Sequence, residues 1–333
     1  MKQEKILALI IFAAASLSFF AAETVEVNIK EWDVPKGAFP HDPAVGPDGS
    51  LWYTGQRSNT IGRVNPKTGE VREYSLKTPD SGPHGLVADN EGNIWYTGNS
   101  KSYIGKLNPT TGEVTEFPMP DPGARDPHTP VFDQKGILWF TVQGGNLVGS
   151  LDPRTGLISL KDVPTPKSRP YGIVVNSKGT PWFCEFNSNK LASINPATLE
   201  ITEHVLPEGA RPRRLTGSPD DMIYYSDYAR GYLGKLDPET GKVTEWPSPG
   251  GTRSRPYGIA ATADGRIWYS ESGVDPNTLV VFDPKTEKFK TWPIPSGGGV
   301  IRHMVATPAG NLFLACSGVN KVGVVEISYS STK

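Results

Sequence analysis

Residues 83–118, with the sequence PHGLVADNEGNIWYTGNSKSYIGKLNPTTGEVTEFP, form the unit that decides the fold, because it recurs along the chain. A Pro-His-Gly turn leads into an apolar run, and a glycine turn then precedes the aromatic pair Trp95-Tyr96. A third run, residues 104–107, is followed by Asn-Pro and Thr-Gly turn residues and by a last run that ends in proline. Four runs separated by turn residues predict four short strands in each unit.

The aromatic residue of the second run recurs at nearly constant spacing. Its seven occurrences lie 42 to 45 residues apart: Trp52, Trp95, Trp139, Trp182, Tyr224, Trp268 and Phe313. Four strands per unit and a period in the low forties are typical of a β-propeller. We therefore predict an all-β, seven-bladed β-propeller with four-stranded antiparallel blades, and we expect the recurring aromatic residues in its core.

The two ends of the chain predict how the ring closes. The last unit stops after its third run, residues 322–327, and lacks a fourth. Residues 27–35, VNIKEWDVP, resemble the fourth run of every other unit. We expect this N-terminal strand to complete the last blade, which would remove the exposed sheet edges that invite aggregation. Residues 23–333 are thus expected to form one domain.

Residues 1–22 have the pattern of a signal peptide. Lys2 and Lys5 precede an apolar run over residues 6–20, and the small residues Ala21 and Ala22 follow. The run is short for a membrane span, and no later segment could cross a bilayer. We expect a periplasmic or secreted protein. Retention of the segment as an anchor is the alternative, because a phenylalanine would lie three residues before the cut.

Charge and cysteine content narrow the function further. The chain has 34 Lys+Arg and 35 Asp+Glu, whereas nucleic-acid binding requires a basic excess. We expect a monomer that binds a small molecule, a glycan or a peptide.

The two cysteines, Cys184 and Cys316, fall in blades four and seven, which stand apart in the ring. A disulfide needs α-carbons within roughly 7 Å, so we predict two unpaired, buried thiols.

One axial mouth should gather the residues that open the first strand of each blade, since this strand lines the channel. These residues are His41, His84, His128, Tyr171, Arg213, Tyr257 and, in the last blade, Arg302 or His303. The first six precede their aromatic residue by 11 positions, but His303 precedes Phe313 by 10. Either the last hairpin is one residue shorter, or Arg302 occupies the mouth position. The structural alternative to a functional role is an imidazole that caps backbone groups between blades.

Three acids are expected on the same face, at the ends of second strands. Glu185, Asp227 and Glu271 each follow the aromatic residue of their blade by three positions. Imidazoles opposite carboxylates can bind a divalent metal, transfer protons or hold a polar ligand. Pairing of the acids with Arg213, Arg214 or Arg255 is the structural alternative.

The Pro-His/Tyr-Gly turn, the Ile-Trp-Tyr/Phe-Thr run and the Ile-Gly-Arg run closely resemble the virginiamycin B lyase (streptogramin lyase) family, from about Val25 to Ile327. The resemblance implies a seven-bladed propeller that opens cyclic streptogramin B depsipeptides at the ester by Mg²⁺-dependent elimination. The family's base corresponds to His303, and a substrate-binding histidine corresponds to Tyr257. Its metal-holding glutamates correspond to Ile301 and the Cys316-Ser317 region, where this chain has no acid.

Three functions follow as expectations. The first is a carbon–oxygen lyase acting on an ester or uronate-like bond, with weak or no streptogramin lyase activity. The second is a non-catalytic periplasmic binding propeller, and the third is a metal-dependent lactonase or hydrolase, whose usual form has six blades. The expected roles are catalysis by His303 and His84, substrate binding by His41, His128, Tyr171, Arg213 and Tyr257, and Mg²⁺ binding by Glu271, Glu185 and Asp227.

Overall fold

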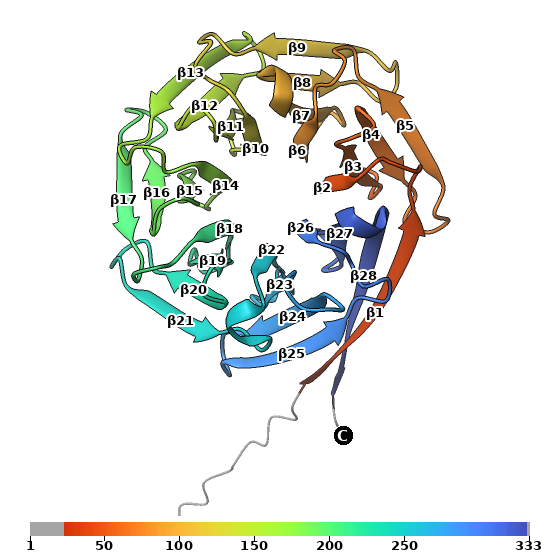
Figure 1. Cartoon of the computed structure of the whole chain (residues 1–333), viewed down its shortest axis with the longest axis vertical. Coiled ribbons are helices and arrows are strands. Elements are labelled where there is room, and N and C mark those ends of the chain that lie inside the picture. Colours follow the sequence, from red (N-terminus) through yellow and green to blue (C-terminus); the bar gives the residue numbers. More distant parts are fainter. Residues whose placement is uncertain (1–22, 332–333) are drawn as a thin grey trace, which may run out of the picture.

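The computed structural model describes residues 23–331, which form a ring of seven four-stranded antiparallel sheets (Figure 1). The predicted seven-bladed propeller is confirmed. The predicted signal peptide, residues 1–22, lies outside the described residues. Between residues 23 and 331, no helix is long and apolar enough to cross a membrane.

Each blade contributes one innermost and one outermost strand, and three single-turn 3-10 helices lie in loops. Blades one to three consist of β2 (Pro40–Val45), β3 (Leu51–Gly55), β4 (Thr60–Val64) and β5 (Val71–Ser75); β6 (Pro83–Ala88), β7 (Ile94–Gly98), β8 (Tyr103–Leu107) and β9 (Val114–Pro118); and β10 (Pro127–Phe132), β11 (Leu138–Val142), β12 (Leu147–Asp152) and β13 (Leu157–Asp162). Blades four to six consist of β14 (Pro170–Val175), β15 (Pro181–Glu185), β16 (Lys190–Ile194) and β17 (Ile201–Val205); β18 (Pro212–Gly217), β19 (Ile223–Asp227), β20 (Tyr232–Leu236) and β21 (Val243–Pro247); and β22 (Pro256–Ala261), β23 (Ile267–Glu271), β24 (Thr278–Asp283) and β25 (Lys288–Pro293). The short helices are η1 (Asn99–Lys101), η2 (Gly251–Arg253) and η3 (Ser317–Val319).

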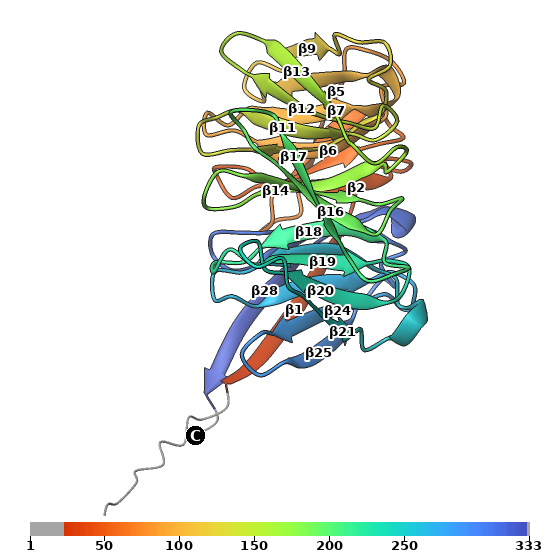
Figure 2. The same cartoon turned by 90° about the vertical axis from the view of Figure 1, so that its left-hand side faces the viewer.

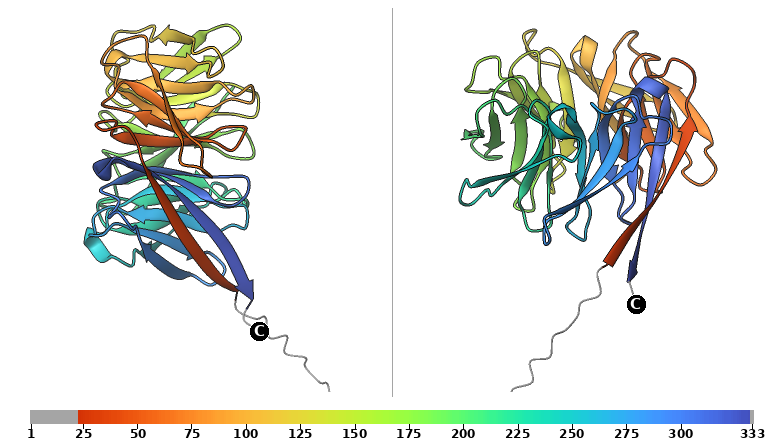
Figure 3. Two further views of the ribbon diagram at one scale, coloured as in Figure 1. Left: turned by 90° about the vertical axis from the view of Figure 1, so that its right-hand side faces the viewer. Right: turned by 60° about the horizontal axis from the view of Figure 1, so that its bottom comes forward.

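The last blade joins the two ends of the chain, as predicted. It contains β26 (Ile301–Ala306), β27 (Leu312–Cys316), β28 (Lys321–Ser331) and β1 (Glu23–Asp33). Val27 of β1 pairs with Ile327 of β28, and Trp32 pairs with Val322. Both strands have 11 residues and extend together beyond the body of the ring (Figures 2 and 3). Closure therefore depends on a long antiparallel pair between segments almost 300 residues apart.

The core lies between neighbouring blades, where the recurring aromatic residues pack. All seven are at most 4% exposed. The threonine or serine two positions after the aromatic residue forms hydrogen bonds that connect one blade to the next. The amide of Gly85 donates to Thr97 Oγ1 (2.8 Å), which donates to the carbonyl of His128 in the following blade (2.9 Å). Thr54, Thr141 and Ser226 donate to the next blade in the same way.

Both cysteines are buried and free, as predicted. Cys184 lies on β15 and Cys316 on β27, in blades that are not adjacent (Figure 1).

Candidate functional site

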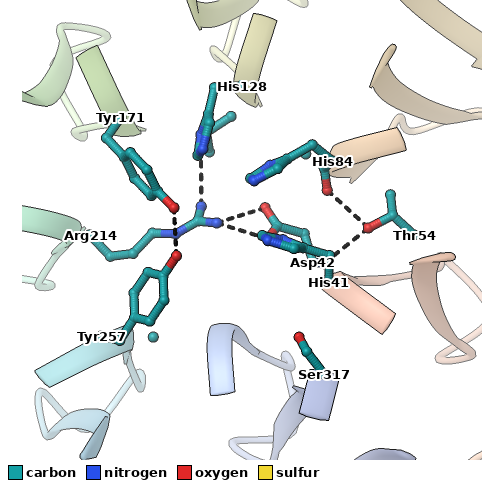
Figure 4. Close-up of polar contacts among 12 residues, drawn as sticks. His41, Asp42, Thr54, His84, His128, Tyr171, Arg214, Tyr257 and Ser317 are labelled. Carbon is teal, nitrogen blue, oxygen red and sulfur yellow. Dashed lines mark hydrogen bonds and ion pairs between the residues drawn. The ribbon is translucent and has the colours of Figure 1, made fainter. Parts of the chain in front are cut away.

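The residues that open the seven innermost strands form an axial ring: His41, His84, His128, Tyr171, Arg213, Tyr257 and Arg302. Four of them are in contact one after another, with ring planes tilted by 45 to 49°. The ring centroids of His41 and His84 are 3.9 Å apart, those of His84 and His128 are 3.8 Å apart, and those of His128 and Tyr171 are 3.9 Å apart. Their exposed fractions are only 3 to 5%. The predicted gathering of His41, His84 and His128 is therefore present, as neighbouring rings around the axis (Figure 4).

The other side of the axial ring holds a cation among aromatic groups. The hydroxyls of Tyr171 and Tyr257 hydrogen-bond across the axis. The guanidinium carbon of Arg213 lies 3.9 Å from the centroid of Tyr257, 4.3 Å from that of Tyr228 and 4.8 Å from that of Phe186. Contacts of this kind favour the charged form of arginine. The Nε of Arg213 is nevertheless buried without a hydrogen-bond partner.

In the last blade, Arg302 and not His303 occupies the axial ring. Ile301 pairs with Cys316, as Pro256 pairs with Glu271 in the preceding blade, so Ile301 stands at the proline position. Arg302 is therefore the counterpart of Tyr257, and its guanidinium lies 5.5 Å from the ring of Phe39. Of the two alternatives left by the sequence, the structure has the second: Arg302 occupies the mouth position, and His303, which was expected to act beside His84, is displaced from the other histidines by one residue.

His303 belongs instead to an inner layer, formed by the residue after each ring residue: Asp42, Gly85, Thr129, Gly172, Arg214, Gly258 and His303. Glycine is needed where the strands approach closely, because a Cβ on Gly85 would lie 2.2 Å from the carbonyl oxygen of His128. The charged members meet across the axis. Arg214 Nη2 donates to both carboxylate oxygens of Asp42 (2.8 and 3.0 Å), and Nη1 donates to Thr129 Oγ1 (3.1 Å) (Figure 4).

Burial sets the protonation of these groups. It lowers the pKa of His84 and His128 well below the usual value, and positively charged or polar neighbours add to the effect. Burial likewise lowers the pKa of His303 to about 3, with Arg214 contributing. Burial also opposes ionisation of Asp42, but Arg214 outweighs it and holds the pKa of that carboxyl well below its usual range. At neutral pH the axis thus contains neutral imidazoles and one internal ion pair.

The three predicted acids are the last residues of their strands, on the same face as the axial ring. Their hydrogen-bond partners, however, do not belong to that ring. Glu185, Asp227 and Glu271 pair with Pro170, Pro212 and Pro256, the residues before the ring residues. Asp227 accepts from Arg230 Nε (2.5 Å).

Glu271 accepts from Ser248 Oγ (2.5 Å), the amide of Gly250 (2.6 Å) and Thr278 Oγ1 (2.5 Å). Glu185 accepts from Ser188, and burial, with Glu203 nearby, raises its pKa to about 7. These partners belong to loops and outer strands, so the acids do not form one cluster with the histidines.

The residues on the axis do not fit Mg²⁺, which requires near-octahedral coordination by oxygen atoms. Among residues 23–331, His41, Asp42 and His84 are the group whose ligand atoms converge, within 4.8 Å. That group offers two nitrogens and one carboxylate, and the carboxylate is already paired with Arg214. The positions of the family's metal ligands hold the buried, apolar Ile301 and the buried Cys316-Ser317 pair.

Asp42 and Arg214 are the axial residues that were not predicted as site residues, and Arg302 was predicted only as the alternative to His303 at the mouth. The constant spacing of 11 residues pointed to Arg302, which precedes Phe313 by that number. Asp42 and Arg214 could also have been recognised in the sequence, because they are oppositely charged residues at the position that glycine occupies in the Pro-His/Tyr-Gly turn.

The fold and site define a seven-bladed β-propeller whose axis is lined by imidazoles, tyrosines and guanidinium groups in contact with one another. A model of the virginiamycin B lyase family matches residues 10–184 and 162–332, and the chain belongs to that family. The resemblance seen in the repeat is thereby confirmed.

Solved structures agree with this assignment. A streptogramin B lyase structure is 25% identical, covers 91% of this chain and 98% of its own, and superposes with a TM-score of 0.83. A virginiamycin B lyase from Staphylococcus aureus is 24% identical, with 90% and 99% coverage and a TM-score of 0.82. The hydrazine synthase of Kuenenia stuttgartiensis shares the fold alone, at 13% identity, 89% and 96% coverage and a TM-score of 0.73. A search against curated proteins returned no match.

Proposed function

We propose that the axial mouth is a metal-independent binding site for a small anionic ligand, whose carboxylate pairs with Arg213 and Arg302. One observation carries the proposal: both guanidinium groups have a buried Nε without a hydrogen-bond partner. A buried donor without a partner costs free energy, and a carboxylate would satisfy it with a charge-assisted bond. Both arginines remain partly exposed, so a ligand can reach them.

The surroundings of the two arginines favour an anion with an aromatic or flat body. The neighbouring imidazoles are neutral, and Asp42 is neutralised by Arg214, so the guanidinium groups supply the charge of the mouth. Phe39, Phe186 and Tyr228 lie beside the arginines and are partly exposed. Aromatic rims of this kind add contact area and stacking to an ionic anchor.

The groups on the axis are poorly suited to proton transfer, which favours binding over catalysis. A general base works best with a pKa near the working pH. The pKa of His84 lies well below that range, and burial raises the pKa of Tyr257 far above it. We accordingly infer a non-catalytic binding propeller that acts outside the cytoplasm after removal of residues 1–22.

Equilibrium dialysis with 2-naphthoate as the probe, in the presence of EDTA, tests the proposal. The wild-type protein is expected to bind 2-naphthoate, and Arg213→Met to bind it at least tenfold more weakly, since a charged hydrogen bond contributes about 1.5 to 3 kcal/mol. Arg72→Met is the matched control. Arg72 also lies over an aromatic ring, that of Tyr74, but on the outer strand β5. Absence of binding, or equal affinity in Arg213→Met, would contradict the proposal.

A carbon–oxygen lyase is the second candidate, favoured by the family membership and by the buried Nδ1 of His84, which has no hydrogen-bond partner. A solved structure of a catalytically inactive virginiamycin B lyase variant from Staphylococcus aureus contains quinupristin, so this compound is a suitable test substrate. Appearance of a new double bond by absorbance, lost in His84→Ala or His303→Ala, would establish the lyase. We expect no such product with or without Mg²⁺.

A further inference from the structure

The opposite end of the propeller axis contains a cavity that is separate from the axial ring. Its volume is ≈ 670 Å³, within the range of roughly 300 to 1,000 Å³ that small-molecule sites have. The cavity is lined by the C-terminal halves of all seven innermost strands and by the turn that follows β2. None of the axial-ring residues lines it. We refer to it as the far cavity.

The far cavity has an apolar wall and a polar floor. Leu86, Ile173, Leu215, Ile259 and Met304 are among the wall residues. The floor contains Thr129 and His303, two members of the inner layer. Since Thr129 Oγ1 is bonded to Arg214, which is bonded to Asp42, this layer separates the far cavity from the axial ring.

His303 is the feature of the floor that points to a ligand. Its Nδ1 is buried and has no hydrogen-bond partner, whereas the corresponding nitrogens of His41 and His128 bond to Asp42 and Thr129. An unpaired buried polar atom costs free energy, and a ligand in contact with this imidazole would recover part of it. The imidazole is neutral at physiological pH, so it selects neither an anion nor a cation.

We propose that the far cavity binds a neutral small molecule with an aromatic or alicyclic body and one hydroxyl group, the hydroxyl bonding to the imidazole of His303. The apolar wall accounts for the body, and the neutral imidazole, which can donate or accept, accounts for the hydroxyl. The site differs in place and in ligand charge from the anion site proposed at the axial ring.

Equilibrium dialysis of the full chain with 2-naphthol, naphthalene and 2-naphthoate tests this assignment. Wild-type protein is expected to bind 2-naphthol. His303→Leu should weaken 2-naphthol binding at least fivefold, as expected for a lost hydrogen bond of about 1 kcal/mol or more, and leave naphthalene binding nearly unchanged. Ala261→Trp, which fills the wall, should abolish binding of both neutral probes.

Two control variants distinguish binding in the far cavity from a general effect of the substitution and from binding at the axial ring. Ala263→Trp introduces the same side chain two residues away, outside the far cavity, and should leave binding of 2-naphthol unchanged. Arg213→Met should weaken 2-naphthoate but not 2-naphthol, so the two sites succeed or fail separately. Lack of 2-naphthol binding by the wild-type protein, or equal binding by Ala261→Trp, would overturn the proposal, as would equal loss of 2-naphthol and naphthalene binding in His303→Leu.

Discussion

Replacing Asp42 by Asn should destabilise the propeller severely, because it isolates a buried charge. The side chains of Asp42 and Arg214 are each 1% exposed, and two hydrogen bonds join them. Arg214 remains protonated, since its pKa is raised: burial opposes the charge, but Asp42 and the nearby tyrosines outweigh it. Removal of one partner from a buried ion pair costs about 3 to 5 kcal/mol. This pair holds blades one and five together across the axis.

Urea denaturation at pH 7 measures the effect as a lower midpoint with an unchanged slope. The double variant Asp42→Ala with Arg214→Met removes both charges and should recover most of the lost stability, because the cost comes from the unpaired charge. Glu239→Gln is the control for an ion pair on the surface, as the side chains of Glu239 and Lys178 are 75% and 61% exposed. Its effect should stay within about 1 kcal/mol. Asp42→Asn with a stability within about 1 kcal/mol of the parent would refute the internal ion pair.

Three further predictions concern the buried histidines, the contacts between blades and the closure of the ring. Because the pKa of His303 is about 3 in the folded state and about 6.5 in the unfolded chain, the unfolded chain binds protons first as the pH falls. The contribution of His303 to the free energy of unfolding is therefore fully present above about pH 7 and falls by up to ~1.4 kcal/mol per pH unit below it. Between pH 7.5 and pH 5, urea titrations should show a smaller loss of stability for His303→Leu than for the parent. Thr97→Val removes the hydroxyl that joins Gly85 to the carbonyl of His128, so a loss of about 1 to 3 kcal/mol is expected, and an unchanged urea midpoint would contradict this role. Deletion of residues 23–33 removes β1 and opens the ring, so a truncated protein that melts within about 2 °C of the parent would disprove closure by the N-terminal strand.

The fold was predictable from the sequence because each blade repeats the same pattern of turn residues and short apolar strands. The aromatic residue from Trp52 to Phe313 marks each second strand, and the missing fourth run of the last unit identifies residues 27–35 as its replacement. Both features depend on the order of residues along the chain. The structure adds that β1 and β28 continue for 11 residues each, a length that the short repeats did not indicate.

The site was only partly predictable, because the direction of a side chain depends on backbone detail. Each innermost strand has a register shift next to its ring residue, such as the one between Pro83 and Leu86. The last blade has Ile301 where the other blades have the proline that marks this position, so the sequence left open whether Arg302 or His303 follows it in the mouth. The repeat pattern also could not predict contacts across the axis. Asp42 and Arg214 are 172 positions apart in the sequence, and only closure of the ring brings them together.

A crystal structure of the protein soaked with 2-naphthoate in the presence of EDTA tests the central claim most directly, namely that the axial mouth binds anions without a metal. We predict density for the carboxylate on the guanidinium of Arg213 or Arg302, with the naphthyl group against Phe186, Tyr228 or Phe39. A mouth without ligand density, in crystals whose packing leaves it open, or a ligand bound only when a divalent metal is supplied, would contradict the claim.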